Sequence, residues 1–419
     1  MDKREDIIGK VKKYNLYFLL SNRISRDKEH NLSRPIVNIS IIGVALGVMT
    51  VLIAMAITNG YQTVIRDKVV GMGSHIRISN YDSNYSFDAT PFEREQFFLQ
   101  DLRQNYDIEH VQFFATKVGI IKTDNQVEGV VLKGIDSTFH WSHFQKNIIE
   151  GENIKIEREK TSNDILISSK LSKKLHLKQG DKVRAYFVQE PLMQRSFTVS
   201  GIFETGLPEF DDRFALVDIR HVQKLNRWDS NMVGGMEILI KDYDKIDEMG
   251  MYVNDQIGYQ LKAETIREIF PQLFDWIELL DTNVLVLMII TILVCTITLI
   301  STFFIIVLEQ TPTIGILKAL GLKNSDIIPI FLILASKILI KGLLIGNGIA
   351  IIFTSLQSRF HLIKLDAAIY YIPYIPVMLN IIEIIIVNIA ILLTCMAVLV
   401  LPSYYIARKI TPVKAIRFD

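Results

Sequence analysis

The side chains of this chain that could do chemistry are few, and they do not form a catalytic set. His140 and His143, in the run FHWSHF, could lie one helical turn apart and share a metal ion. Two histidines without an acidic or cysteine neighbour are weak support for a metal site, and packing or surface histidines explain them better. The sequence has no GxxxxGK(S/T) phosphate loop and no HExxH, GxSxG or paired-cysteine motif. These observations predict a protein that is not an enzyme and that holds no metal or cofactor of its own.

Ionisable side chains inside apolar sequence form a second candidate group. Lys337 and Lys341 lie four residues apart, and so on one helix face, within the apolar run 327–356. Each would cost about 2.5–3.5 kcal/mol at the centre of a bilayer. At 1.5 Å per residue, Lys341 lies about 21 Å from the start of that run, and Glu383 in the run 377–401 lies at nearly the same depth. One hypothesis is a Lys341–Glu383 ion pair. The other is that the helix starts later and both lysines extend to the membrane surface.

Long apolar runs must position these charges. Of the 419 residues, 49% are hydrophobic, and the excess is concentrated in the runs 36–58, 284–308, 327–356 and 377–401. Each exceeds the ~20 residues that cross about 30 Å of hydrocarbon. The two cysteines lie in these runs, which is typical of small apolar residues and argues against a disulfide framework. The predicted fold class is therefore an α-helical membrane protein with four transmembrane helices.

Two glycine pairs in these runs predict close helix packing. GVALG places Gly43 and Gly47 four residues apart, and GLLIG does the same for Gly342 and Gly346. Small residues at this spacing let helix backbones approach closely. The sequence leaves open whether the contact at Gly43 and Gly47 lies within one chain or between two.

Basic residues set the expected orientation. Nine lysines and arginines precede the first run and four follow the last, so both termini are expected in the cytoplasm. The segment 309–326, with Lys318 and Lys323, falls on the same side. The formal net charge is only +1, which gives no support for nucleic acid as a partner.

The sequence between the first two runs is mixed and polar, and its length of roughly 220 residues suits a large α+β domain on the far side of the membrane. The expected segments are a cytoplasmic start with an interfacial helix at 15–24 (1–35), a first span (36–58), the outer domain (59–263), a stalk helix interrupted at Pro271 (264–283), a second span (284–308), a cytoplasmic helix (309–326), a third span (327–356), a short outer loop (357–376), a fourth span (377–401) and a cytoplasmic tail (402–419).

The segment Glu309–Asp326, EQTPTIGILKALGLKNSD, predicts a short helix between two spans. Thr311 suits the N-cap, Pro312 the first helical position and Gly321 the C-terminal stop. Its apolar residues gather toward one side: Ile314, Ile316, Leu317 and Leu320. Such a segment is either a loop lying on the membrane surface or a docking helix for a partner.

Two motifs give the chain a resemblance to a known superfamily. EQTPTIGILKALG at 309–321 is similar to the E-x-x-x-x-I-G-I-L-K-A-L-G of ABC transporter permeases of the MacB/FtsX superfamily, and ARKITPVKAIR at 407–417 resembles their terminal motif. The resemblance covers nearly the whole chain. It implies a MacB-like periplasmic core domain and a coupling helix that inserts into a separate ATPase subunit, which would carry ATP and Mg²⁺. The residues that would contact the ATPase are Glu309, Ile314, Gly315, Ile316, Leu317, Lys318, Leu320 and Gly321.

A finer resemblance, to the lipoprotein-releasing permeases LolC and LolE, rests on four further segments. These are GVALGVM at 43–49, NGY at 59–61, KVVGMGSHIRI at 68–78 and GIFETGLPEFD at 201–211. The resemblance implies a subunit of the bacterial inner membrane that draws a lipoprotein from the bilayer between the first and second spans and passes it to a periplasmic carrier. The candidate cavity walls are Val48, Leu52, Met55, Leu285 and Met288.

The sequence departs from this pattern at one place. Carrier-recruiting permeases have a long protruding hairpin in the outer domain, whereas QEPLMQR at 189–195 is short. Pro191, Leu192 and Met193 could still form an apolar tip that contacts a carrier, and a plain hairpin turn is an equal alternative.

Three functions remain open at this point. The first is lipoprotein extraction with an ATPase, a second permease subunit, lipoprotein, lipids and a periplasmic carrier as partners. The second is MacB-like efflux of small molecules or peptides, and the third is FtsX-like mechanical control of a periplasmic enzyme. The resemblance leaves open whether the chain is LolC-like, LolE-like or forms a homodimer.

Overall fold

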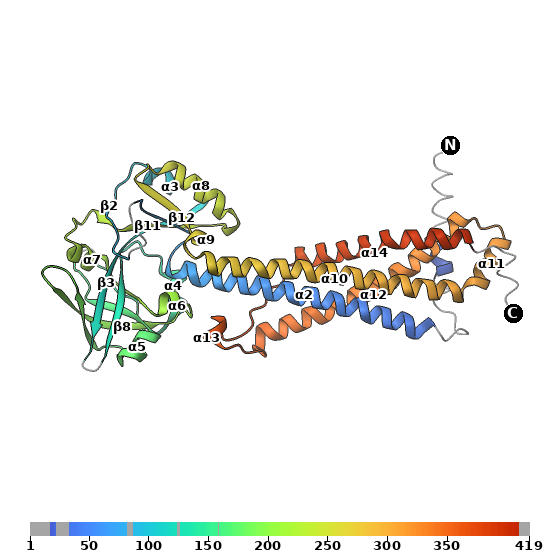
Figure 1. The fold of residues 1–419 in the computed structure, drawn as a ribbon, viewed down its shortest axis with the longest axis horizontal. Coiled ribbons are helices and arrows are strands. Elements are labelled where there is room, and N and C mark those ends of the chain that lie inside the picture. Colours follow the sequence, from blue (N-terminus) through green and yellow to red (C-terminus); the bar gives the residue numbers. More distant parts are fainter. Residues whose placement is uncertain (1–16, 22–32, 82–86, 124–125, 158, 410–419) are drawn as a thin grey trace. The chain divides into compact units, whose positions relative to one another are not determined.

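The computed structural model of the chain describes residues 17–21, 33–81, 87–123, 126–157 and 159–409 (Figure 1). The chain divides into two compact units, which we call the membrane unit and the outer unit. The membrane unit has the limits Met1–Gln62, Ile277–Lys364 and Tyr374–Asp419, and the outer unit has the limits Thr63–Trp276 and Leu365–Pro373.

Long apolar helices form the membrane unit, and four of them are long and apolar enough to cross a bilayer, as predicted. They are α2 (Ser33–Met72), α10 (Pro271–Glu309), α12 (Asn324–Phe360) and α14 (Ile381–Lys409). At 1.5 Å per residue, a helix of 40 residues, such as α2, is about 60 Å long, twice the thickness of the hydrocarbon layer. Helices α2 and α10 therefore extend beyond the membrane, and each contributes residues to both units.

The core of the membrane unit is made by side chains from all of its long helices. Val44, Val48 and Leu52 of α2 are almost fully buried in it, and Cys295 and Cys395 are buried there as free thiols. Small residues let the backbones of these helices approach each other closely. A Cβ at Gly346 of α12 would lie 2.6 Å from the carbonyl oxygen of Ala45, so only glycine allows this contact.

The first glycine pair, in α2, also lies close to another helix of the chain. A Cβ at Gly47 would lie 2.8 Å from Cγ2 of Thr291 in α10, and one at Gly43 would lie 3.8 Å from Cγ2 of Thr298. Both glycines of α2 therefore face α10 of the same chain.

Several element boundaries differ from the predicted ones. The helix of the first span, α2, continues to Met72, whereas the predicted span ends at 58. No separate stalk helix runs over 264–283: its first residues end strand β12 (Leu261–Thr265), a short helix α9 (Ile266–Ile269) follows, and the rest is continuous with the second span in α10. Pro271 begins that helix instead of interrupting it, because proline is well tolerated in the first turn. The fourth span begins at Ile381, four residues later than the apolar run.

The outer unit is built on a mixed sheet of ten strands. Its strand order is β12-β1-β11-β3-β4-β9-β6-β8-β5, and β7 pairs with both β3 and β8. Neighbours are antiparallel except for β4 with β9 and β6 with β8. The strands are β1 (Ile76–Asn80), β3 (Ile108–Lys122), β4 (Val127–Ile135), β5 (Ile148–Gly151), β6 (Asp164–Ser168), β7 (Lys182–Phe187), β8 (Met193–Phe203), β9 (Phe214–Asp218) and β11 (Gly235–Ile240), with a separate pair β2 (Phe92–Glu93) and β10 (Met232–Val233).

Short helices connect and cover these strands, so the outer unit is the α+β domain that was predicted. They are α3 (Leu99–Gln104), α4 (Trp141–Phe144), α5 (Ser169–Leu175), α6 (Pro208–Asp211), α7 (Ile219–Asn226) and α8 (Ile246–Gln256), and α13 (Ala367–Tyr370) lies in the segment between α12 and α14. Large aromatic side chains fill the core, among them Phe113, Phe144 and Phe203. Their burial fixes the positions of the strands that carry the sites described next.

Candidate functional site

The predicted cytoplasmic helix is present as α11 (Thr311–Ala319). Pro312 lies in its first turn, as expected, but its N-cap is Gln310 and no side chain caps it. The Thr311 hydroxyl instead donates to the carbonyl oxygen of Val307, 3.0 Å away. Gly321 follows the helix at φ +100°, a conformation that favours glycine and stops the helix as predicted.

The two faces of α11 differ in exposure. Ile314 and Gly315 are buried, and Ile314 belongs to the core of the membrane unit. Ile316 is 57% exposed and Leu320 is 76% exposed. Leu317 is only half-exposed. Because residues four apart share a helix face, Ile316 and Leu320 together form an unpartnered apolar stripe within the described part of the chain.

Glu309 lies just before α11, at the end of α10. Its Oε1 atom is buried and has no hydrogen-bond partner among the described residues. A buried carboxylate oxygen left without a donor costs about 1–3 kcal/mol or more. The sequence alone placed Glu309 in the coupling motif but gave no sign of this unmet acceptor.

The start of α12, which follows α11, is held by the N-terminal segment. The Tyr17 hydroxyl donates to Oδ1 of Asp326 at 2.8 Å, and the other carboxylate oxygen accepts from the backbone amide of Lys323 at 3.2 Å. Residues 17–21 are helical, within the predicted interfacial helix at 15–24. The ends of that predicted helix lie outside the described residues, as does the terminal motif beyond Lys409.

The two lysines of α12 have different surroundings. Lys337 donates to the Ser21 hydroxyl, and its ammonium lies 4.4 Å from the centre of the Phe18 ring. The hypothesis that both lysines extend to the membrane surface stays a prediction. Lys341 is exposed on the side of α12 and has no ion pair within the described ranges.

The proposed Lys341–Glu383 ion pair is not formed. Glu383 accepts a hydrogen bond from Nδ2 of Asn59 in α2 at 2.5 Å. The depth argument was wrong because α14 begins at Ile381, which places Glu383 in the first turn of its helix, whereas Lys341 lies near the middle of α12. Asn59 belongs to the NGY motif, so this motif anchors the start of the fourth span.

Gly60 of the same motif explains why the chain needs glycine there. A Cβ at this position would lie 2.6 Å from the carbonyl carbon of Pro376. The backbone amide of Met378 also donates to the carbonyl oxygen of Ala56 at 2.8 Å. The segment that leads into α14 is therefore seated directly on α2.

The residues predicted to line a substrate cavity do not share one environment. Val48 and Leu52 are buried in the core of the membrane unit, and Met55 and Met288 are packed against it. Leu285 is 51% exposed on α10. Of these five residues, only Leu285 presents a largely open apolar surface. The substrate cavity stays a prediction.

Two of the segments singled out in the sequence meet in the outer unit. In GIFETGLPEFD, the Asp211 carboxylate accepts from the backbone amides of Thr205 at 3.0 Å and Gly206 at 2.8 Å, which closes a tight loop. Lys68, the first residue of KVVGMGSHIRI, donates to the carbonyl oxygens of Thr205 at 2.6 Å and Tyr371 at 2.8 Å. Lys68 thus ties α2 both to this loop and to the segment between α12 and α14.

The backbone at this junction is unusual. Tyr371 has φ +63°, which is uncommon for a residue with a side chain, and Gly206 has φ +74°. A Cβ at Gly206 would lie 2.5 Å from Nζ of Lys68 and 2.9 Å from the carbonyl oxygen of Tyr371. The loop therefore fits only with glycine at 206.

Gly206→Ala is expected to destabilise this junction by more than Gly180→Ala destabilises its own loop. Both glycines have positive φ, so alanine costs about 1–2 kcal/mol at either site, but nothing lies within 4 Å of a Cβ at Gly180. Crowding adds about 1–3 kcal/mol at Gly206. Hydrogen exchange of the full chain should show faster exchange at 365–373 in Gly206→Ala alone. Equal exchange in the two variants would contradict the assigned Lys68 contact.

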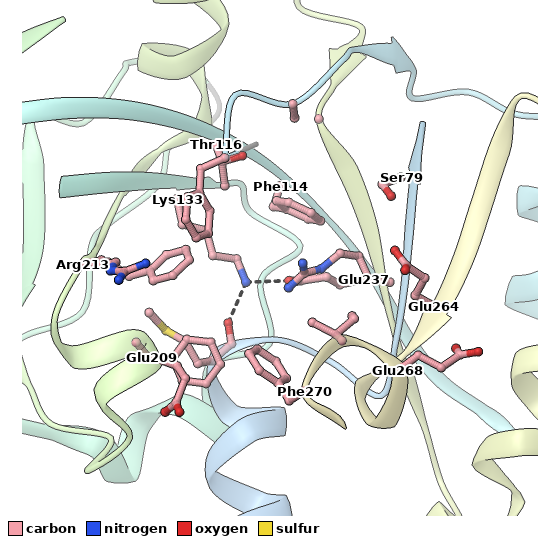
Figure 2. Close-up of a pocket in the computed structure, with 18 of the residues that line it drawn as sticks. Ser79, Phe114, Thr116, Lys133, Glu209, Arg213, Glu237, Glu264, Glu268 and Phe270 are labelled. Atoms are coloured by element: carbon pink, nitrogen blue, oxygen red, sulfur yellow. Dashed lines mark hydrogen bonds and ion pairs between the residues drawn. The ribbon is translucent and has the colours of Figure 1, made fainter. Parts of the chain in front are cut away.

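The outer unit also contains a cavity of about 770 Å³. Its wall combines aromatic rings, such as Phe114 and Phe270, with charged side chains that include Lys133, Arg213 and Glu237 (Figure 2). The volume lies in the range of ligand-binding pockets. Its residues come from several strands and from the segments around α6 and α9, so no contiguous motif marks it in the sequence.

A buried polar network borders this cavity. Nζ of Lys133 donates to Oε1 of Glu237 at 2.6 Å and to the carbonyl oxygen of Met72, the last residue of α2, at 2.7 Å (Figure 2). Glu237 also accepts from Nε2 of Gln112 at 2.8 Å, and Gln112 accepts from the backbone amide of His140 at 2.8 Å. Burial lowers the pKa of Lys133, and the nearby Glu237 carboxylate opposes this shift.

This network was missed in the sequence, although a signal existed. Lys133 is the one charge in the buried half of the strand VEGVVLKGI, and Glu237 is the one charge in the buried strand GMEILI. Both side chains are at most 5% exposed. A charge in the middle of a buried strand must find a partner, and two such strands in one domain predict a pair.

The loop between β7 and β8 is a short hairpin, as its length indicated. The two strands pair antiparallel from Lys182 with Thr198 to Phe187 with Met193. At its tip Pro191 is exposed, Leu192 is 67% exposed and Met193 is half-buried. Val188 adds a further exposed apolar side chain. The tip is therefore apolar and open to solvent in the described outer unit.

Comparisons with known proteins place the chain in a family. Residues 39–255 match the MacB-like periplasmic core domain, and residues 285–410 match the FtsX-like permease C-terminal domain. The chain is 25% identical to the lipoprotein-releasing system transmembrane protein LolC of Buchnera aphidicola, covering 91% of this chain and 93% of the relative. It is 22% identical to the corresponding LolE of Haemophilus influenzae, covering 90% and 93%.

The periplasmic region of MacB from Actinobacillus actinomycetemcomitans aligns with 49% of this chain and 95% of its own, at 12% identity and a TM-score of 0.33. The first family match covers more than half of the chain and spans the region from α2 to α8. Membership in this permease family implies an ATPase partner. The chain belongs to the ABC transporter permeases of the MacB/FtsX type, with four membrane spans and an extracytoplasmic MacB-like core domain between the first two.

Proposed function

We propose that this chain is a permease subunit that extracts lipoproteins from the outer leaflet of the bacterial inner membrane for transfer to a periplasmic carrier. The observation that carries the proposal is the similarity to LolC and LolE proteins along almost the full length of both partners in each comparison. The Lys68 junction supports it, because two of the four segments that suggested this finer resemblance are in contact there. Both termini would then be cytoplasmic and the outer unit periplasmic.

The apolar stripe on α11 is the proposed contact with the ATPase, which would bind ATP and Mg²⁺ on its own chain. Ile316 and Leu320 would enter a groove of that subunit, as amphipathic helices do when they dock. Ile314 and Gly315 would pass the motion to the core of the membrane unit. Lys318 would lie at the rim of the contact. A shift of α11 that brought a hydrogen-bond donor to the buried Glu309 oxygen would remove the desolvation cost of that oxygen. The unpaired carboxylate would therefore favour such a shift.

The route for the lipoprotein is proposed along α2 and α10. Leu285 offers an exposed apolar surface on α10, and Val48, Leu52, Met55 and Met288 lie within or against the core beside it. A second permease subunit, identical or related, would complete the cavity. Each acyl CH₂ buried in the bilayer favours retention by about 0.8 kcal/mol, so extraction needs an energy source such as ATP hydrolysis.

The hairpin tip is the proposed carrier contact. Leu192 and Val188 are exposed there, and Pro191 and Met193 flank Leu192 in sequence. An apolar tip of this kind suits a partner that offers an apolar groove.

Depletion of the protein in its own bacterium tests the function. We expect mature triacylated lipoproteins to accumulate in the inner membrane, as measured by fractionation and immunoblotting, and expression of the wild-type chain to restore their release. If lipoproteins sort normally while sensitivity to toxic small molecules rises, the chain is an efflux permease. If only cell-wall hydrolysis changes, it is a mechanical transmitter.

A further inference from the structure

Three side chains with metal-binding groups converge at one corner of the outer unit. They are Glu109, His140 and His143, and their nearest ligand atoms all lie within 4.8 Å of one another. Glu109 is exposed and both histidines are half-buried, so solvent can reach the group. The sequence offered two histidines without an acidic neighbour, and the fold supplies that neighbour from another element.

The backbone around this corner is well fixed. Glu109 is the second residue of β3, His140 is the N-cap residue of α4, and His143 lies within α4. The amide of His140 is bound by Gln112, which is part of the buried Lys133–Glu237 network. These contacts hold the three Cα positions while leaving the exposed ends of the side chains free to adjust.

Further groups at the corner support metal ligation. The hydroxyl of Ser142 lies 3.1 Å from Nδ1 of His140, which is the kind of second contact that orients a metal-bound imidazole. The His110 and His140 rings have their centres 5.2 Å apart, and Nε2 of His110 lies 2.5 Å from the carbonyl oxygen of Thr138. The backbone therefore engages one nitrogen of His110, and His110 lies beside the group of three ligand atoms within 4.8 Å without belonging to it.

The donor set selects the metal class. Two imidazoles and one carboxylate are a set that binds Zn²⁺, with bonds of about 2.0–2.2 Å. Tetrahedral bonds of that length need donor atoms about 3.3 Å apart, so rotation of side chains that already lie within 4.8 Å is sufficient. Three protein ligands leave one position for water.

We propose that Glu109, His140 and His143 form a Zn²⁺ site that joins the start of β3 to α4 in the outer unit. The corner adjoins the end of α2, because a Cβ at Gly71 would lie 3.1 Å from the carbonyl oxygen of His143. Zinc would cross-link β3 and α4 and so stiffen the segment on which α2 ends. This role is separate from the proposed lipoprotein function and does not depend on it.

Zinc titration of the untagged full-length chain in nanodiscs tests the proposal. Competition with a zinc-responsive dye at pH 7.5 is expected to reveal one site, and His140→Gln, His143→Gln and Glu109→Gln should each weaken it by about tenfold or more. His176→Asn is the matched control, because His176 is exposed, lies outside the cluster and has a positive φ that asparagine tolerates. This variant should bind zinc like the wild type.

Two results would overturn the site. One is zinc binding that survives in the His140→Gln and His143→Gln variants, and the other is an equal loss of binding in His176→Asn. Hydrogen exchange gives an independent readout: zinc should slow exchange at 138–147 and at the start of β3 in the wild-type chain and not in His143→Gln. Unchanged exchange on saturation of the wild-type chain with zinc would also refute the cross-link.

Discussion

Replacing Ile316 and Leu320 together by aspartate is expected to abolish binding of the ATPase and ATP-dependent transport, while the chain still inserts and folds. The two side chains form the exposed stripe of α11, and their neighbour Leu317 is only partly exposed. Two carboxylates in an apolar groove would remain unpaired, which costs several kcal/mol and therefore reduces affinity more than a hundredfold. Co-purification of the ATPase and lipoprotein release in reconstituted vesicles are the measurements.

The control is the conservative pair Ile316→Leu with Leu320→Ile, which keeps apolar volume and should retain binding within a few-fold. Membrane insertion and thermal unfolding should match the wild type in both double variants, since neither residue belongs to the core. Normal ATPase binding by the aspartate variant would show that α11 is not the coupling helix and only connects two spans at the membrane surface.

Lys133→Met is expected to destabilise the outer unit by about 3–5 kcal/mol, because it leaves the buried Glu237 carboxylate without its cation. The carbonyl oxygen of Met72 also loses a donor at the end of α2. Hydrogen exchange of the full chain should show the loss as faster exchange of β3, β4 and β11, whose pairing surrounds the network.

The matched control is Lys262→Met, which removes a lysine from another ion pair at the same cavity. Its partner is Glu264, and Lys262 is 42% exposed, so the expected cost is about 0–1 kcal/mol. The double variant Lys133→Met with Glu237→Leu should recover part of the loss, because no buried charge remains. A Lys133→Met variant as stable as Lys262→Met would show that the buried pair does not hold the domain together.

The sequence predicted elements best where periodicity and length were strong. The four spans, the helix after the second one and an α+β domain between the first two spans were predicted from pattern alone. Short strands such as β5, β6, β9 and β12 could not be identified in this way, because a few residues of apolar sequence do not identify a strand without its partners. The start of α14 was misplaced because the residues from Val377 to Asn380 are apolar enough to continue the run, yet they form an extended segment seated on α2.

The candidate sites also contain parts that the sequence predicted and parts that it could not predict. Motif spacing identified α11 and the segments that contain Lys68 and Asp211. It could not identify Tyr371, the third partner of the Lys68 junction, because Tyr371 lies about 160 residues beyond Asp211 in the chain. Glu109 lies about 30 residues from His140 in sequence and reaches it only through the path of the sheet. Counting residues to estimate depth paired Lys341 with Glu383, because the count took the limits of the apolar runs as the limits of the helices. The hydrogen-bond partner of Glu383 is Asn59, a neutral residue that a search for opposite charges does not find.

The contact of Lys68 with the Tyr371 carbonyl oxygen has a consequence for the way the outer unit is completed. The outer unit takes residues from two separate parts of the chain, 63–276 and 365–373. Its second part lies between α12 and α14 in sequence, and Lys68 binds it to the loop closed by Asp211. The outer unit therefore lacks one of its own segments until the chain has been synthesised beyond α12.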